Sequence, residues 1–154
     1  MIRVQQDDFD VGTEIAALKA GRTDIGAVVA FLGTVRDHAG GRAVEEMLLE
    51  HYPGMTEAEL QSIEQEACAR WPLQASVIVH RYGELKPGDN IVLVLTASEH
   101  REAAFRAAEF LMDYLKTRAP FWKRETGPGG DRWAEARAGD EAARRRWDTK
   151  NAAQ

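Results

Sequence analysis

The sequence predicts one α+β domain, in which an antiparallel or mixed sheet is covered by two principal helices. The chain has 154 residues, which is long enough for one domain with a real core and too short for two comfortable ones. Runs rich in β-branched and apolar residues alternate with segments whose apolar residues recur at helical spacing. No internal repeat, low-complexity tract or linker divides the chain. We therefore expect strands and helices to share one core.

The first half of the chain predicts two strands followed by a helix. Residues 26–36, GAVVAFLGTVR, are typical of a buried strand that ends in a Gly-rich turn. Residues 44–52, VEEMLLEHY, predict a second strand, and the short connection favours an antiparallel hairpin between the two. Thr56 and Glu59 fit a capping box at the start of a helix that should stop before Pro72.

The second half predicts two more strands and the longest helix. Residues 75–85 and 90–100 have strand character and are separated by the turn signal Lys-Pro-Gly-Asp at 86–89. An apolar stripe at helical spacing then predicts a helix over 99–118, with Ser98 as its N-cap.

Proline ends this long helix and reverses the chain. After Pro120, residues 121–126 (FWKRET) are predicted to be extended, and residues 127–131 (GPGGD) form a tight loop that leads to a short final helix.

Charge and composition exclude several classes of protein. The net charge of -5 argues against broad nucleic-acid binding, which requires a basic face. The longest apolar run, near residues 91–95, is far shorter than the roughly 20 residues of a membrane span. The N-terminus lacks the pattern of a secretory signal, and the single Cys68 cannot form an internal disulfide. A cytoplasmic protein is therefore expected.

Three residues at the ends of predicted strands are candidate anion ligands. His100 and Arg101 stand at the start of the long helix, where free backbone N–H groups and the helix dipole favour a phosphate. A capping histidine beside a surface arginine is the alternative. Arg36 closes a strand before a Gly-rich turn and is placed either to reach a ligand or simply to lie in water.

Two lysines flank the proline that ends the long helix. Lys116 follows the apolar Leu115, so its ammonium is either partly desolvated and chemically useful, or extends to solvent along its aliphatic stem. Lys123 shares a strand face with Phe121 by alternation. The reversal at Pro120 permits both amines to converge on one pocket.

Other conspicuous residues indicate structure more than chemistry. Cys68 is expected to be a small core or boundary thiol, and the histidines show no metal-ligand spacing, so no zinc site is expected. The Gly-rich stretches at 33–42 and 126–132 lack the Lys-Ser/Thr of a phosphate loop, which disfavours nucleotide triphosphate chemistry.

Five stretches resemble the large, catalytic subunit of molybdopterin synthase in their order and spacing. The longest, MDYLKTRAPFWKRE, is the most specific. The stretches are LEHYPGMTE (49–57), RWPL (70–73), HRYGELKPGD (80–89), SEHREAAF (98–105) and MDYLKTRAPFWKRE (112–125). The resemblance extends to residue 147 and implies a domain over 1–147, with a short tail at 148–154.

The resemblance implies a fold of the α/β hammerhead type and a definite reaction. Enzymes of this family convert cyclic pyranopterin monophosphate (precursor Z) into molybdopterin by inserting two sulfurs as a dithiolene. The sulfur arrives on the C-terminal Gly-Gly thiocarboxylate of a small ubiquitin-like carrier subunit. The large subunits form a homodimer with one small subunit at each end, which gives a heterotetramer. No metal or organic cofactor is implied.

The resemblance also implies roles for individual residues. Lys116 and Lys123 match the two catalytic lysines of the family, and His100 with Arg101 matches its substrate-phosphate pair. The full set of implied substrate-binding residues is Thr34, Val35, Arg36, His100, Arg101, Lys116, Lys123, Arg124, Glu125 and Arg137.

Two functions from other classes stay open. A non-catalytic module would hold the tail of a ubiquitin-like protein without sulfur transfer, but would leave the pair His100 and Arg101 unexplained. A hydrolase of phosphate ligands would turn over without a partner, but the sequence offers no evident metal cluster or activated serine.

Overall fold

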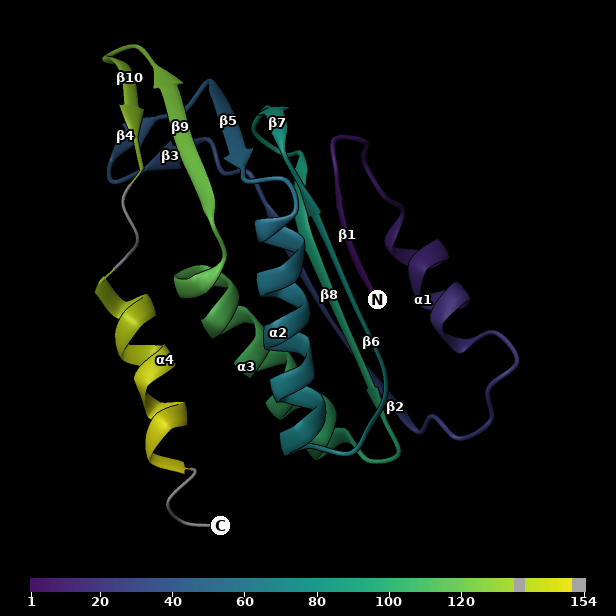
Figure 1. Ribbon diagram of the computed structural model, residues 1–154. Helices are drawn as coiled ribbons and strands as arrows, with labels where there is room; N and C mark the ends of the chain where they lie inside the picture. Colours follow the sequence, from purple (N-terminus) through teal and green to yellow (C-terminus); the bar gives the residue numbers. More distant parts are fainter. Residues whose placement is uncertain (135–137, 151–154) are drawn as a thin grey trace.

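A four-stranded mixed sheet forms the centre of the molecule (Figure 1). This structure is a computed structural model that describes residues 1–134 and 138–150. The strands lie in the order β1 (Ile2–Gln5), β6 (Leu73–Arg81), β8 (Asn90–Ser98) and β2 (Ala27–Thr34). β1 pairs with β6 in parallel, and the other two pairings are antiparallel. The sheet is therefore mixed, as predicted.

A second, antiparallel sheet lies beyond one end of the first. Its order is β10 (Gly130–Trp133), β9 (Phe121–Gly127), β5 (Glu46–His51) and β7 (Gly83–Leu85). The chain passes from the first sheet into the second between β6 and β7, where Gly83 has a φ of 94°. A side chain is strained at this backbone angle, so glycine permits the crossing.

Helices cover both faces of the central sheet. α2 (Met55–Arg70) and α3 (Arg101–Arg118) pack on the face that carries Ile78, whereas α1 (Val11–Lys19) packs on the face that carries Val77. Successive side chains of a strand point to opposite faces, so β6 and β8 contribute to both cores. None of the helices described is both long and apolar enough to cross a membrane.

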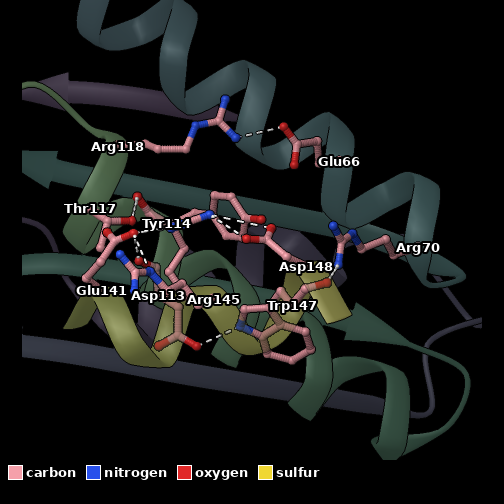
Figure 2. Close-up of polar contacts among 11 residues, drawn as sticks. Glu66, Arg70, Asp113, Tyr114, Thr117, Arg118, Glu141, Arg145, Trp147 and Asp148 are labelled. Atoms are coloured by element: carbon pink, nitrogen blue, oxygen red, sulfur yellow. Dashed lines mark hydrogen bonds and ion pairs between the residues drawn. The ribbon is translucent and has the colours of Figure 1, made fainter. Parts of the chain in front are cut away.

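The last helix, α4 (Ala138–Lys150), is fastened to α3 through Trp147 (Figure 2). The Trp147 side chain is 1% exposed and packs edge-on against Trp71 and Phe110. Its indole Nε1 donates to Asp113 at 2.7 Å, and Arg70 donates to its backbone oxygen at 3.2 Å. A buried indole N–H with a partner satisfies both the apolar and the polar requirements of tryptophan.

Two predictions about the first long strand are wrong. Residues 27–34 and 46–51 belong to different sheets and do not form a hairpin. The Gly-rich turn between them instead folds on itself as a small hairpin, β3 (His38–Ala39) with β4 (Arg42–Ala43). β2 is also an edge strand rather than a buried one, with Phe31 and Leu32 exposed by 38% and 42%.

The predicted caps of the long helices are displaced by a few residues. The N-cap of α2 is Gly54, whose N–H donates to Glu57 at 2.6 Å, while Glu59 instead accepts from Arg118. The N-cap of α3 is His100, and the Ser98 hydroxyl donates to the His100 carbonyl oxygen. Several local polar partners compete at each terminus, so sequence spacing alone does not select among them.

The prediction omitted the first strand and the first helix. β1 has only four residues, and α1 has no buried residue, so neither carries a strong periodic signal. The single strand predicted at 75–85 is divided in the structure: β6 ends at Arg81, and residues 83–85 form β7 in the second sheet. The strand predicted at 90–100, which ends at Ser98, the stop of α2 before Pro72 and the extent of α3 are confirmed.

Two phenylalanines of α3 provide a matched test of the core. Phe110 is fully buried, whereas Phe105 is 60% exposed on the same helix. We expect Phe110→Ala to lower the free energy of unfolding by about 3–5 kcal/mol, because the cavity adds to the lost transfer energy. Phe105→Ala should change it by about 0.5 kcal/mol or less. Urea denaturation measures both, and equal losses would contradict the core assignment.

Candidate active site

Lys116 and Lys123 line the same pocket, which has a volume of about 180 Å³. The pocket lies where the two sheets, the end of α3 and the start of α4 meet. Apolar side chains make up much of its wall, namely those of Met47, Leu49, Ile91, Leu115, Ala119, Phe121 and Ala134. His80 and Asp140 also line it. The predicted convergence of the two lysines is therefore confirmed.

The tight return of the chain after α3 brings the two lysines together. Lys116 is on the last turn of α3, and the Phe121 N–H donates to the Ala119 carbonyl oxygen at 2.9 Å. β9 then begins at Phe121 and runs beside β5. Phe121 and Lys123 are two residues apart on this strand, so their side chains share the face that lines the pocket.

Glu125 lies beneath Lys123 on the same face of β9. It is 5% exposed, and its carboxylate is 4.0 Å from Lys123 Nζ and 3.2 Å from Arg132. A buried carboxylate is costly unless it is paired, so two cations accompany it. Glu125 therefore places a compensated negative charge beside Lys123. Arg124 alternates to the other face of β9, where its Nε is buried without a hydrogen-bond partner within the described chain.

His80 is a pocket residue to which the sequence analysis gave no role. It is 4% exposed, and its ring stacks on Phe121 with centroids 3.7 Å apart. The pKa of His80 is lowered from 6.5 to about 4, mainly by burial and to a smaller extent by the nearby Lys116 and His51, whereas the hydrogen bond to the Arg81 carbonyl opposes the shift. The ring is therefore neutral at pH 7. Alternation with buried Ile78 along the strand was the available signal.

His100 and Arg101 form a second cationic cluster at the other end of α3. They line a hollow together with Glu102, Phe105 and Arg106, and the His100 side chain, 3.7 Å from Glu99, is 85% exposed. Lys116 follows His100 by sixteen positions along α3, a distance of about 24 Å at 1.5 Å per residue. The fold of one chain therefore separates the predicted phosphate pair from the lysine pocket.

The remaining predicted residues are placed near the pocket or outside the described chain. Val35 is 3% exposed and packs with Met47 and Leu49, which line the pocket. Its neighbours Thr34 and Arg36 are exposed at the end of β2, and neither lines this pocket. Arg137 lies outside the residues that the structure describes.

Neither a metal cluster nor a reactive thiol is found among the described residues. This part of the chain has no group of three or more His, Cys, Asp or Glu side chains placed to hold a metal ion. Cys68, expected in the core or at its boundary, is exposed on α2. Partial burial and the nearby Glu64 raise the pKa of its thiol, which disfavours the nucleophilic thiolate.

These features define an α+β protein with a cationic pocket suited to anionic ligands. Comparison with known proteins then gives the family. A family model described as "MoaE protein" matches residues 4–118, and the chain belongs to this family.

Relatives match along nearly the whole chain. A molybdopterin synthase catalytic subunit from Mesorhizobium japonicum is 55% identical, over 97% of this chain and 94% of its own length. Another with the same name, from Pseudomonas aeruginosa, is 58% identical over 96% and 98%. The solved structure of a molybdopterin biosynthesis MoaE protein from Burkholderia ambifaria is 55% identical, covers 96% of this chain and 97% of its own, and has a TM-score of 0.83. The predicted family and fold class are confirmed.

Neutral, buried His80 should make stability depend on pH. Because the pKa of His80 is about 4 in the folded chain and 6.5 when unfolded, the unfolded state binds more protons between these values. The contribution of neutral His80 to the free energy of unfolding is fully present above pH 6.5. It should fall by an amount on the order of 3 kcal/mol as the pH drops to 4.

His80→Gln removes this titration and provides the control. Urea denaturation from pH 4 to 8 should show a shallower loss for the variant, because the acidic residues titrate in both proteins. Parallel curves would contradict a buried, neutral His80.

Proposed function

We propose that the chain is the catalytic subunit of a molybdopterin synthase, a sulfurtransferase of molybdenum cofactor biosynthesis. It transfers sulfur from the C-terminal thiocarboxylate of a small ubiquitin-like carrier to cyclic pyranopterin monophosphate, forming the dithiolene of molybdopterin. The observation that carries this proposal is the convergence of Lys116 and Lys123 in one pocket of a MoaE family member. The relatives named as catalytic subunits support it.

The reaction requires fixed positive charge. A cyclic phosphate and a thiocarboxylate are both anions, and their repulsion must be offset when they meet. Two ammonium groups against an apolar wall act more strongly than they would in water, because the low polarity around them reduces screening. The chain is acidic overall, so this pocket is a local exception.

The two lysines are proposed to act at different steps. Lys116 orients the thiocarboxylate and assists proton transfer as sulfur attacks the pterin side chain. Lys123, fixed by the buried Glu125, stabilises the charge that develops. His100 and Arg101 hold the phosphate through ring opening. Because the partner supplies the sulfur, Cys68 is not needed as a nucleophile, and the proposal invokes no metal or organic cofactor.

Two copies of the chain complete the site in this proposal. The phosphate pair is about 24 Å along α3 from Lys116, too far for one small substrate to bridge. We therefore place His100 and Arg101 of one copy at the lysine pocket of another. The edge strand β2, with exposed Phe31 and Leu32, offers an apolar surface for the homodimer at the centre of a heterotetramer.

The other implied contacts complete the proposal. Thr34, Val35, Arg36, Arg124, Glu125 and Arg137 are proposed to contact or frame the substrate. A narrow pocket suits a Gly-Gly tail, since glycine has no side chain to accommodate. We place the protein in the cytoplasm, with a functional domain at 1–147 and a short tail at 148–154.

Loss of Lys116 should abolish most of the activity. We expect Lys116→Ala to slow molybdopterin formation by about 100-fold or more, because a positioned acid–base group is removed. Lys19→Ala, an exposed lysine of α1, is the matched control and should retain the normal rate. The assay supplies thiocarboxylated carrier and precursor to each folded variant. Near-normal formation by Lys116→Ala would sink the assigned role, and turnover without any carrier would favour a hydrolase.

A mixing experiment tests the shared site. Lys116→Ala and Arg101→Ala should each be inactive as homodimers. If the site combines both copies, mixed dimers contain one intact site, and co-refolded protein should recover about a quarter of normal activity. If mixed dimers form but recover no activity, both clusters must act within one copy, which would contradict the shared site.

A further inference from the structure

We propose that His80 is a positioning residue of the lysine pocket, whose Nε2 accepts a hydrogen bond from the Lys116 ammonium and fixes its direction. This inference rests on the proposed function. It assigns a role to a buried residue that lies on the central sheet, outside the segments that carry Lys116 and Lys123.

The hydrogen bond to the backbone determines the tautomer of His80. Its Nδ1 is 2.8 Å from the carbonyl oxygen of Arg81, which can only accept, so Nδ1 carries the proton. In a neutral ring the lone pair is then on Nε2. Within the described chain, Nε2 is not among the buried side-chain atoms that lack a partner, as expected for a ring edge that opens onto the pocket.

Packing fixes the position of this acceptor. The ring is 4% exposed and lies nearly parallel to Phe121, with 16° between the planes. Phe121 in turn begins the strand that carries Lys123, so the stacked pair joins the central sheet to β9. The ring is fixed by the hydrogen bond of its Nδ1 and by stacking on Phe121, so it loses little conformational freedom when Nε2 accepts a hydrogen bond.

A neutral acceptor suits this pocket better than a charged one. A carboxylate beside Lys116 would orient the amine but would also repel the two anionic reactants. An imidazole orients it while leaving the net charge of the pocket unchanged. Of the charged groups around the ring, Lys116 from α3 and His51 from β5 favour its neutral form. Lys123 from β9 and Asp140 from α4 also line the pocket, and a carboxylate such as that of Asp140 acts in the opposite sense.

Two substitutions of His80 separate hydrogen bonding from stacking. His80→Phe keeps an aromatic ring against Phe121 but has no acceptor. His80→Gln loses the ring but offers an amide N–H to Arg81 and an amide oxygen to the pocket. The assay measures molybdopterin formation by the complex with thiocarboxylated carrier, and separates kcat from the KM for the carrier.

We expect His80→Phe to lower kcat at least tenfold with KM changed less than threefold, and His80→Gln to keep at least a third of the normal kcat. A normal rate in His80→Phe, or equal losses in both variants, would overturn the inference. Wild-type protein that makes no molybdopterin would instead refute the proposed function.

Nitrogen NMR tests the same contact without turnover. In labelled wild-type protein at pH 7, His80 should show a protonated Nδ1 and an Nε2 resonance shifted by hydrogen bonding. In Lys116→Ala that Nε2 resonance should move toward the value of an unbonded imidazole nitrogen. An Nε2 resonance that is the same in both proteins would show that Lys116 is not its donor.

Discussion

Burial of the apolar stripe of α3 against the central sheet is the constraint on which the pocket depends. Phe110, Leu111 and Leu115 pack on the face of β6 and β8 that carries Ile78 and Val94, and this fixes both the position and the rotation of the helix. Lys116 follows directly in sequence, so its direction is set by the same burial. The chain reverses at Ala119, and β9 then brings Lys123 to the same pocket as Lys116.

The ionisable groups of the proposed site avoid the cost of buried charge in three different ways. Glu125 is buried but stands between Lys123 and Arg132, so its charge is compensated where it lies. His80 is buried without charge, because desolvation and a neighbouring ammonium favour the neutral ring. At the far end of α3, His100 and Arg101 remain in water, where the Arg101 charge costs little until a phosphate arrives. The site thus combines positive charge with an apolar wall at modest cost.

The local sequence pattern predicted most helices and strands, but it did not predict which distant strands pair or which distant side chains meet. The apolar, strand-like runs within 75–85 and 90–100 and the stripe of α3 were recognised because each is a property of one segment. The false hairpin between 27–34 and 46–51 arose because a short connection does not reveal that a strand belongs to another sheet. Lys116 and Lys123 were found because one proline links them. His80 was missed because its neighbours in space, Phe121 and Lys116, are far away in sequence.

The unbroken course of α3 has a consequence for how such a chain can vary. One helix carries His100 and Arg101 at its start and Lys116 in its last turn, so its length fixes the distance and the rotation between them. Inserting one residue would lengthen the helix by only about 1.5 Å but would rotate the residues after the insertion by about 100° about the helix axis. Either end would then face the wrong way. The number of residues in α3 therefore determines how the groups at its two ends face relative to one another.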